Sequence, residues 1–503
     1  MSTKKRVLEN SFLYTFSSLL INAVSFFLLP VYTLFLTPQD YGIVNLANNF
    51  IQVTIFAIAF SLYSAVVRFY ADFKNDIEKV KRFYGTIVTF TGISGMVIVS
   101  LGLIFNEILI SWFFDGISFY PAVFIILLSV TFFSLRNLHH SMLQGMQQGK
   151  KLTLINLIFF GLQVCLTLFF IGVLKLGAIG VLLTTCLLNI GYFIYMVFDL
   201  KRNNLITFCI DVKILRAALA YSLPLIPHDS STQIASFASR IFINVNGSLA
   251  SVGLYSVASQ FGALIDTVQS SVNRAFQPWF YEMMNKDNLN SKREVVNLSS
   301  FLLLLYSLVY LGIGLFSQEV IILMTNKGYI MAWTIIPILV IAFSLKSIYY
   351  FYVNVLFYHK SAVRFIFIAT IIGSFADIIS AYMLVPKYGM YGAAISFLIA
   401  KMIVVTIVVL LSKRYDDIGY RVKGMLRIII SSIIFMGVGL YFSYTKYMTV
   451  FSWSNLFYKI CIFLLYLIYT YLTNRKIIKK IVNTEKIQQV LKKKGKLKSK
   501  HSA

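Results

Sequence analysis

Charged residues are scarce in this chain of 503 residues. They make up 13% of the sequence, about half the share of roughly 25% found in soluble globular domains. Hydrophobic residues make up 58% and aromatic residues 16%. This composition excludes an ordinary water-soluble enzyme and a disordered or fibrous chain. The few charges are clustered, and the apolar runs between them are long enough to cross a bilayer, so the sequence predicts a polytopic membrane protein.

The sequence also lacks motifs for metal, nucleotide or disulfide chemistry. Its four cysteines have no CxxC spacing. The stretch Gly145–Lys151 does not have the GxxxxGK[ST] spacing and contains no Ser or Thr, so it does not support ATP hydrolysis. His139 and His140 are adjacent, which places them about 100° apart on a helix and makes them a poor pair of metal ligands. We therefore expect no cofactor and no metal.

Long apolar runs account for most of the chain. A membrane-spanning helix needs about 20 mainly apolar residues. The fourteen stretches that meet this requirement are residues 11–36, 42–67, 83–105, 118–142, 152–173, 176–198, 218–245, 250–273, 297–318, 330–355, 363–384, 389–411, 426–444 and 453–473. The longest connection outside the tail lies near 274–296. No predicted outside loop is long enough for a catalytic domain, so we expect a transporter rather than an enzyme.

The positive charges predict the orientation in the membrane. Lys and Arg exceed Asp and Glu by 45 to 19, a net charge of +26. If the N-terminus is cytoplasmic, 36 Lys and Arg lie in inside segments, and only Lys175, Lys327, Lys387 and Lys446 lie outside. This asymmetry predicts a multi-pass protein with both termini in the cytoplasm, and it explains the net charge without nucleic acid as a partner. The first apolar run has no small-residue cleavage site, so it is predicted to be a helix rather than a signal peptide.

An internal duplication links the two halves of the chain. Three pairs of segments match in order at offsets of 210 to 212 residues: 41–47 with 252–258, 134–140 with 344–350, and 173–180 with 385–392. The duplicated unit contains six helices, so both copies have the same orientation. This predicts two pseudo-symmetric lobes with the substrate site between them.

The duplication sets the expected domain boundaries. They are a cytoplasmic N-terminus at 1–10, an N-lobe at 11–205, a C-lobe at 206–415, two further helices at 416–473, and a basic cytoplasmic tail at 474–503. The tail is expected to touch anionic lipid, and a specific partner site is the alternative.

Cations inside or near the spans are the candidate substrate-binding residues. Ionisable groups in a membrane usually face a bundle interior or a water-filled cavity. Arg136 corresponds to Lys346 in the duplication, and Arg68 corresponds to Arg274 if a local gap is allowed. We expect these four around one central cavity, because the arginine fork donates two hydrogen bonds to phosphate oxygens. Alternatively, Arg68 and Arg274 extend to lipid headgroups. Arg240 faces either the cavity or the outer headgroups.

Three acids are candidates for ion coupling. Asp229 follows Pro224 and Pro227, which predict a bent or broken helix of the kind that lines a cavity. Asp266 and Asp377 lie within other predicted spans. Each acid can carry a proton or a cation, or can neutralise a neighbouring arginine.

Two segments resemble a known family. They are Leu36–Gly42 (LTPQDYG) and Ser239–Ala258 (SRIFINVNGSLASVGLYSVA). Together with the arrangement of six, six and two helices, they make the chain similar to polysaccharide-unit flippases of the multidrug/oligosaccharidyl-lipid/polysaccharide (MOP) exporter superfamily. The resemblance implies two lobes like those of MATE transporters, in an all-α polytopic fold.

The resemblance also implies a function. Such a protein moves an undecaprenyl-diphosphate-linked oligosaccharide from the cytoplasmic to the outer leaflet of the bacterial inner membrane, for O-antigen, capsule or exopolysaccharide synthesis. Its expected partners are this substrate, membrane lipids, and polysaccharide polymerase or chain-length machinery. A lipid II flippase is the near alternative, because the diphosphate anchor is shared. A drug/cation antiporter is disfavoured because buried cations equal or outnumber buried acids, and a glycan polymerase is disfavoured by the short outside loops.

Overall fold

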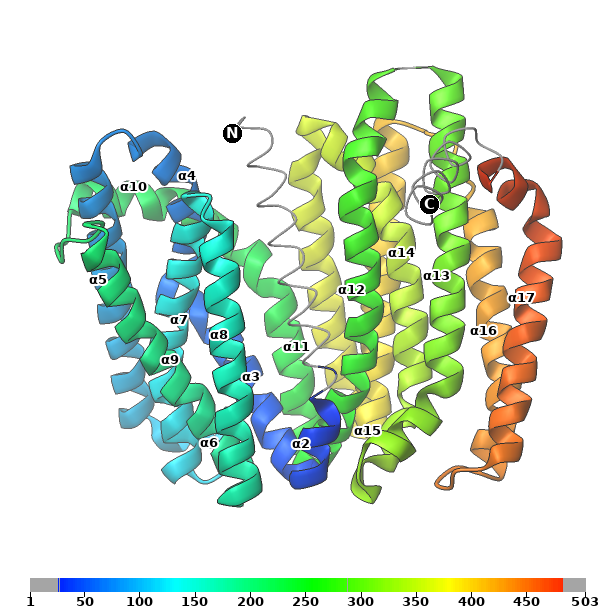
Figure 1. Cartoon of the computed structure of the whole chain (residues 1–503), viewed down its shortest axis with the longest axis horizontal. Helices are drawn as coiled ribbons and strands as arrows, with labels where there is room; N and C mark the ends of the chain where they lie inside the picture. The colour runs from blue at the N-terminus through cyan, green and yellow to red at the C-terminus, as the bar shows by residue number, and fades with distance from the viewer. Residues whose placement is uncertain (1–25, 27, 287, 483–503) are drawn as a thin grey trace, which may run out of the picture. The chain divides into compact units, whose positions relative to one another are not determined.

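The computed structural model describes residue 26 and residues 28–286 and 288–482, and within these ranges it contains helices and no strand (Figure 1). The helices are α2 (Leu29–Phe35), α3 (Pro38–Ala59), α4 (Leu62–Phe73), α5 (Ile77–Ile104), α6 (Asn106–Phe113), α7 (Phe124–Gly145), α8 (Gly149–Leu168), α9 (Gly177–Arg202), α10 (Val212–Ser222), α11 (Ile226–Asn246), α12 (Leu249–Asn285), α13 (Leu289–Met324), α14 (Ile336–Tyr358), α15 (Val363–Tyr415), α16 (Val422–Thr445) and α17 (Trp453–Val482). The predicted all-α polytopic fold is confirmed.

Ten of the described helices are long and apolar enough to cross a membrane. The helices α11 and α12 are not among them, because both carry many polar residues. Helix α15 is counted once although it contains two predicted spans, which meet at a kink where Gly389 has a φ of +54°. The first predicted span, 11–36, lies mostly outside the described residues. These differences account for the gap between ten helices and fourteen predicted spans.

Two sequence-based expectations about helix boundaries are wrong. The connection near 274–296 is largely helical, because α12 continues to Asn285 and α13 already begins at Leu289. Beyond the apolar run, α12 keeps one buried face through Phe276, Phe280 and Met283, which stabilises an amphipathic helix that a search for apolar runs misses. The single helix predicted over 42–67 is instead interrupted between α3 and α4, where Phe60 and Ser61 adopt left-handed conformations.

The predicted break beside Pro224 and Pro227 is confirmed. Helix α10 ends at Ser222, a short 3-10 segment covers Leu223–Leu225, and α11 begins at Ile226. Proline cannot donate a backbone hydrogen bond, so this pair favours a new helix start rather than a continuous helix. The break places Asp229 in the first turn of α11.

The chain divides into two compact units. The first contains residues up to 260 together with 324–335 and 370–400, and the second contains 261–323, 336–369 and the residues from 401 onward. In the first unit, aromatic and aliphatic side chains of α4, α5, α7 and α9 form a buried cluster that includes Phe83, Leu138 and Tyr192. The lobe boundaries expected from the duplication stay a prediction.

Two equivalent glycines of the duplication meet where α3 crosses the start of α12, within the first unit. A Cβ atom on Gly42 would overlap the carbonyl oxygen of Leu249, and a Cβ atom on Gly253 would overlap the carbonyl oxygen of Pro38. Gly253 follows Gly42 by 211 residues, and Leu249 follows Pro38 by the same 211. The contact is therefore reciprocal, as a local two-fold relation between the two repeats requires, and only glycine permits the backbones to approach this closely.

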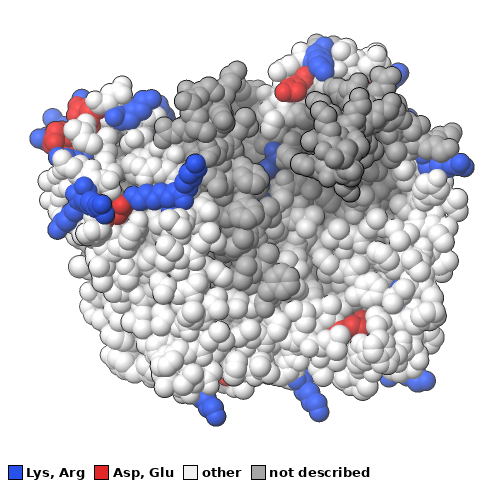
Figure 2. All heavy atoms as spheres, in the orientation of Figure 1, with Lys and Arg blue, Asp and Glu red and all other residues white. Residues whose placement is uncertain are grey.

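Charged side chains lie mainly toward the helix ends. Figure 2 shows Lys and Arg gathered there on the face that it draws, whereas the helix sides between these ends carry few charges. This distribution fits helices whose middle sections face lipid.

Candidate functional site

Arg240 of α11 lies inside the first unit and is 9% exposed. Its Nη1 donates to the carbonyl oxygen of Ser236 at 2.9 Å and to the hydroxyl of Ser236 at 2.7 Å. The guanidinium carbon lies 5.6 Å from the centroid of the Tyr255 ring. Asp377 of α15, which is 6% exposed, attracts the Arg240 charge electrostatically. Two residues predicted for different roles thus lie near each other, and the acid partly balances the cation.

Asp229 of α11 accepts a hydrogen bond from a tyrosine of α4 in the same unit. The hydroxyl of Tyr63 on α4 donates to Asp229 Oδ2 at 2.9 Å. The same Tyr63 hydroxyl lies 3.3 Å from the Ser61 hydroxyl, at the break between α3 and α4. Both helix breaks, one before α4 and one before α11, therefore bring polar groups to the same place in the first unit.

Arg136 of α7 has only weak partners. Its Nη1 lies 3.5 Å from Asn189 Oδ1, and the guanidinium carbon lies 5.2 Å from the Tyr192 ring centroid; both partners are on α9. Among the described residues, no carboxylate lies within 4.0 Å of it. The guanidinium has five N–H donors, so Arg136 retains unused hydrogen-bonding capacity and an uncompensated charge.

Arg68 and Arg274 are both exposed but differ in their partners. Arg68 of α4 forms an ion pair with Asp72 at 2.7 Å, with side chains 54% and 52% exposed. Exposed pairs of this kind contribute about 0–1 kcal/mol. Arg274 of α12 donates from Nη2 to the Ser271 hydroxyl at 3.2 Å, and in the described part of the chain no acid pairs with it. Arg274 is therefore the more available of the two for an anionic ligand.

Lys346 and Asp266 neutralise each other in the second unit. Lys346 Nζ on α14 lies 2.6 Å from Asp266 Oδ1 on α12. The hydroxyl of Tyr350, one turn further along α14, donates to the same oxygen at 3.1 Å. A residue predicted for substrate binding and another predicted for ion coupling thus form one ion pair.

The predicted site residues are distributed over both units. Arg68, Arg136, Arg240, Asp229 and Asp377 belong to the first unit, whereas Arg274, Lys346 and Asp266 belong to the second. Within the units, the structure pairs Lys346 with Asp266, and it places Asp377 within electrostatic range of Arg240. The convergence of the four duplicated cations around one cavity stays a prediction.

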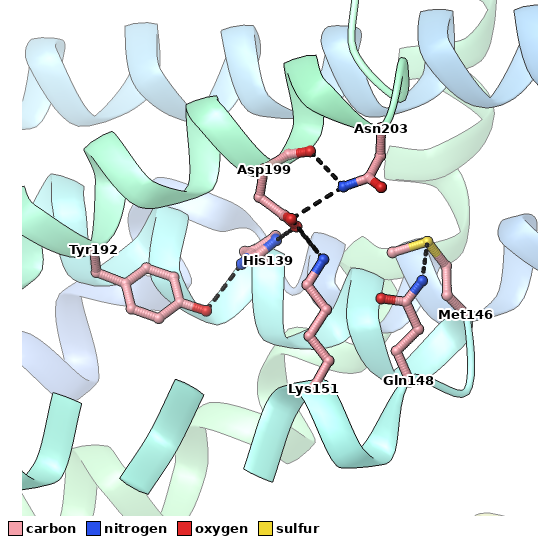
Figure 3. A network of polar contacts seen from close by, with 7 residues as sticks. All are labelled: His139, Met146, Gln148, Lys151, Tyr192, Asp199 and Asn203. Atoms are coloured by element: carbon pink, nitrogen blue, oxygen red, sulfur yellow. Dashed lines mark hydrogen bonds and ion pairs between the residues drawn. The ribbon is translucent and has the colours of Figure 1, made fainter. Parts of the chain in front are cut away.

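A buried polar network in the first unit was not anticipated from the sequence (Figure 3). His139 of α7 is 0% exposed; its Nε2 lies 3.2 Å from Asp199 Oδ2 and its Nδ1 lies 2.9 Å from the Tyr192 hydroxyl. Lys151 of α8 contacts both Asp199 oxygens, at 2.5 and 2.7 Å, and Asn203 donates to Asp199 Oδ1 at 3.0 Å. The sequence does contain one signal for this network. Asp199 lies near the end of a long apolar helix, where a carboxylate needs a polar or charged partner.

A second network, in the second unit, joins α13 to α17. Lys459 Nζ is 2.8 and 2.9 Å from the two carboxylate oxygens of Glu319, and 2.9 Å from Gln318 Oε1. Asn455 donates to Gln318 and to Ser443 of α16. Lys459 is 0% exposed and Glu319 is 5% exposed. Lys459 stands out in the sequence as a cation within a span, but its partner is 140 residues away.

The helices and the interior charges described above define a helical multi-pass membrane protein. Known proteins of the same class are similar to this chain. Residues 7–284 match the family described as polysaccharide biosynthesis protein. This is more than half of the chain, and the chain belongs to that family. It is also 24% identical over 368 residues to an Lsg locus protein of Haemophilus influenzae, across 70% of this chain and 85% of the relative.

Solved structures of the MOP superfamily have the same fold. The lipid II flippase MurJ in an inward closed conformation superposes with a TM-score of 0.69 at 19% identity, over 94% of this chain and all of that chain. An inward-facing MATE multidrug resistance transporter superposes with a TM-score of 0.57 at 18% identity, over 84% of this chain and 95% of that one.

Proposed function

We propose that this protein flips an undecaprenyl-diphosphate-linked oligosaccharide repeat unit from the cytoplasmic to the outer leaflet of the bacterial inner membrane. The product serves surface polysaccharide synthesis, and both termini lie in the cytoplasm. The observation that carries this proposal is membership of the polysaccharide biosynthesis family over residues 7–284. The superposition on a lipid II flippase supports a lipid-linked substrate. Alternating access of the two lobes moves the substrate, and the protein catalyses no covalent step.

The side-chain contacts rank the cations for diphosphate binding. Arg136 and Arg274 have no carboxylate partner among the described residues, so they can offer their full charge to phosphate oxygens. Lys346 is paired with Asp266, and Arg68 with Asp72, so each must first exchange a partner. Arg240 is buried and lies within electrostatic range of Asp377, so its charge is already partly balanced.

Asp229 is the acid that we assign to ion coupling. Asp266 is paired with Lys346, and Asp377 lies near Arg240, so their charges are balanced by cations of the protein. Asp229 accepts instead from the neutral Tyr63 hydroxyl beside two helix breaks. A carboxylate in such a place can take up a proton or a cation without breaking an ion pair.

A lipid II flippase is the second candidate. The higher of the two TM-scores above, 0.69, belongs to such a protein. The diphosphate contacts proposed here serve both substrates equally, because both are anchored through the same group. Depletion of the cell's own lipid II flippase separates them: rescue of growth by this protein favours lipid II.

Charge-neutral replacement of Arg274 tests the proposal in cells. Arg274→Gln is expected to reduce surface glycan at least about tenfold, because a hydrogen bond to a charged group contributes about 1.5–3 kcal/mol. Surface glycan is measured by gel or lectin binding and normalised to the amount of protein in the membrane. Arg293→Gln is the matched control, an exposed arginine on α13 of the same unit, and it should retain wild-type output. Full glycan output from Arg274→Gln contradicts the assigned role.

A further inference from the structure

The network around His139 connects a partly exposed cation, Lys151, to the half-buried Arg136. Contacts run from Lys151 to Asp199, from Asp199 to His139, and from His139 to the Tyr192 hydroxyl (Figure 3). The ring of this same Tyr192 lies 5.2 Å from the Arg136 guanidinium carbon. The path joins α8, α9 and α7, and nothing in the proposed transport step uses it.

The hydrogen-bond directions in the neutral network are fixed by chemistry. The ionised carboxylate of Asp199 can only accept, so His139 Nε2 carries the proton and donates to Oδ2 across 3.2 Å. In neutral imidazole the other ring nitrogen is then an acceptor. His139 Nδ1 therefore accepts from the Tyr192 hydroxyl across 2.9 Å. In this state both ring nitrogens are satisfied, and the charges of Lys151 and Asp199 cancel.

On the His139 imidazole a further proton can bind only at Nδ1, because Nε2 already carries one. The resulting N–H donates to the Tyr192 oxygen, and the Tyr192 hydroxyl proton rotates away from the imidazolium. The groups that face His139 are Asp199, Tyr192 and Tyr195 from α9 and Lys151 from α8. Its own helix adds Arg136 and His140. The network thereby changes from neutral to a net charge of +1.

His140 does not offer an equivalent proton site. Its Nε2 is buried, and no hydrogen-bond partner is described for it. A buried charge without a partner is costly, whereas the charge on His139 lies against the Asp199 carboxylate. The geometry therefore selects His139 of the two adjacent histidines.

We propose that His139 is a proton-binding site, and that its protonation strengthens the binding of a phosphate-type dianion at Arg136. The inference rests on the proposed function to the extent that Arg136 binds the substrate diphosphate. His139 and Arg136 are three residues apart on α7, so their Cβ atoms lie about 5–6 Å apart on one helix face. The added positive charge raises the electrostatic potential around Arg136 and therefore favours an anion bound to the Arg136 guanidinium. By linkage, the anion in turn favours the proton by the same factor.

The test is the pH dependence of sulfate binding to the purified full-length protein, measured by isothermal titration calorimetry. Sulfate stands in for one phosphate group, and its charge stays at −2 between about pH 4.5 and pH 8, a range that extends well below the ordinary titration of histidine. We expect wild-type affinity to be at least about fivefold higher at the acidic end. His139→Gln should remove this difference, because glutamine keeps a donor and an acceptor but cannot be charged. His140→Gln is the matched control and should keep it.

A second variant covers the case in which His139→Gln does not fold. Tyr192→Phe keeps the ring against Arg136 but removes the oxygen that accepts from protonated Nδ1. In Tyr192→Phe, we expect the acid-induced increase in sulfate affinity to occur at lower pH than in the wild-type protein. Wild-type affinity that is equal at both pH values overturns the inference, as does a pH response that is lost in His140→Gln but kept in His139→Gln.

Sulfate binding to Arg136→Gln separates the proton linkage from the proposed phosphate-binding role of Arg136. Sulfate binding that Arg136→Gln weakens, but that does not respond to pH, overturns only the proton linkage. Sulfate binding that Arg136→Gln leaves unchanged overturns both the linkage and the role of Arg136 as a phosphate ligand.

Discussion

Replacing Lys459 with alanine is expected to destabilise the second unit by about 3–5 kcal/mol, because it leaves the carboxylate of Glu319 buried without its partner. Lys459 is 0% exposed and Glu319 is 5% exposed, and Nζ lies within 2.9 Å of both carboxylate oxygens. No other cation replaces Lys459 there among the described ion pairs. The variant should melt at a clearly lower temperature, and α17 should lose its attachment to α13 first.

Thermal melting of the detergent-solubilised protein measures this effect. Lys459→Met combined with Glu319→Gln removes both charges and should recover most of the stability. A buried ion pair stabilises a protein little or no more than a well-packed neutral pair of similar volume. Lys79→Gln is the control, because it removes an exposed ion pair with Asp76, whose side chains are 63% and 44% exposed, and should change stability by less than about 1 kcal/mol. An alanine variant as stable as this control contradicts the account of the network.

Replacing Gly253 with alanine is expected to have an effect of similar size for a different reason. The new methyl group would overlap the carbonyl oxygen of Pro38, which is backbone and cannot rotate away. The helices α3 and α12 must then separate, and overpacking of this kind costs about 1–3 kcal/mol and occasionally more. We expect at least about 3 kcal/mol, and the same from Gly42→Ala, because the contact is reciprocal.

Gly92→Ala on α5 is the matched control for the glycine crossing. A Cβ atom on Gly92 would meet nothing within 4 Å. Gly92→Ala should therefore be neutral or stabilise the helix by up to about 1 kcal/mol, since alanine is a better helix former than glycine. Gly253→Ala should therefore lower the melting temperature, whereas Gly92→Ala should leave it unchanged or raise it. A Gly253→Ala protein that melts like Gly92→Ala would falsify the close crossing.

Local chemistry made much of the fold predictable. The apolar runs located the long helices because the bilayer sets their length and their hydrophobicity. Pro224 and Pro227 predicted the break before α11, since two prolines three residues apart remove two backbone N–H donors and favour a helix start. The match of 41–47 with 252–258 singled out a repeated segment, and the structure shows Gly42 and Gly253 in reciprocal contact.

Partners distant in sequence were not predictable from a single chain. Lys459 is a cation within an apolar run, but nothing in the neighbouring sequence indicates its partner Glu319, 140 residues earlier. His139 was considered only as a metal ligand beside His140, because Asp199 and Lys151 lie on other helices. The helical extension of α12 was missed because its buried face beyond the membrane run is amphipathic rather than uniformly apolar.

The pairing of charges explains how this protein can hold many cations in a membrane, and it supports the anion binding proposed above. Lys346, Arg68 and Lys459 lie within 2.9 Å of carboxylate oxygens, so their charge is balanced within the protein. Arg136 and Arg274 have no such partner among the described residues. A phosphate group can supply the missing negative charge at either arginine, which is the physical basis for proposing each of them as a phosphate ligand.

Transfer of a lipid-linked oligosaccharide between leaflets of protein-containing liposomes tests the central claim most directly. Liposomes are loaded with undecaprenyl-diphosphate oligosaccharide, and a membrane-impermeant glycosidase reports the fraction exposed outside over time. The account predicts that wild-type protein makes the inner-leaflet fraction accessible, and that combined replacement of Arg136 and Arg274 with glutamine returns the rate to that of protein-free liposomes. Wild-type protein that leaves the inner fraction protected, or a double variant that transfers as fast as wild type, would contradict it.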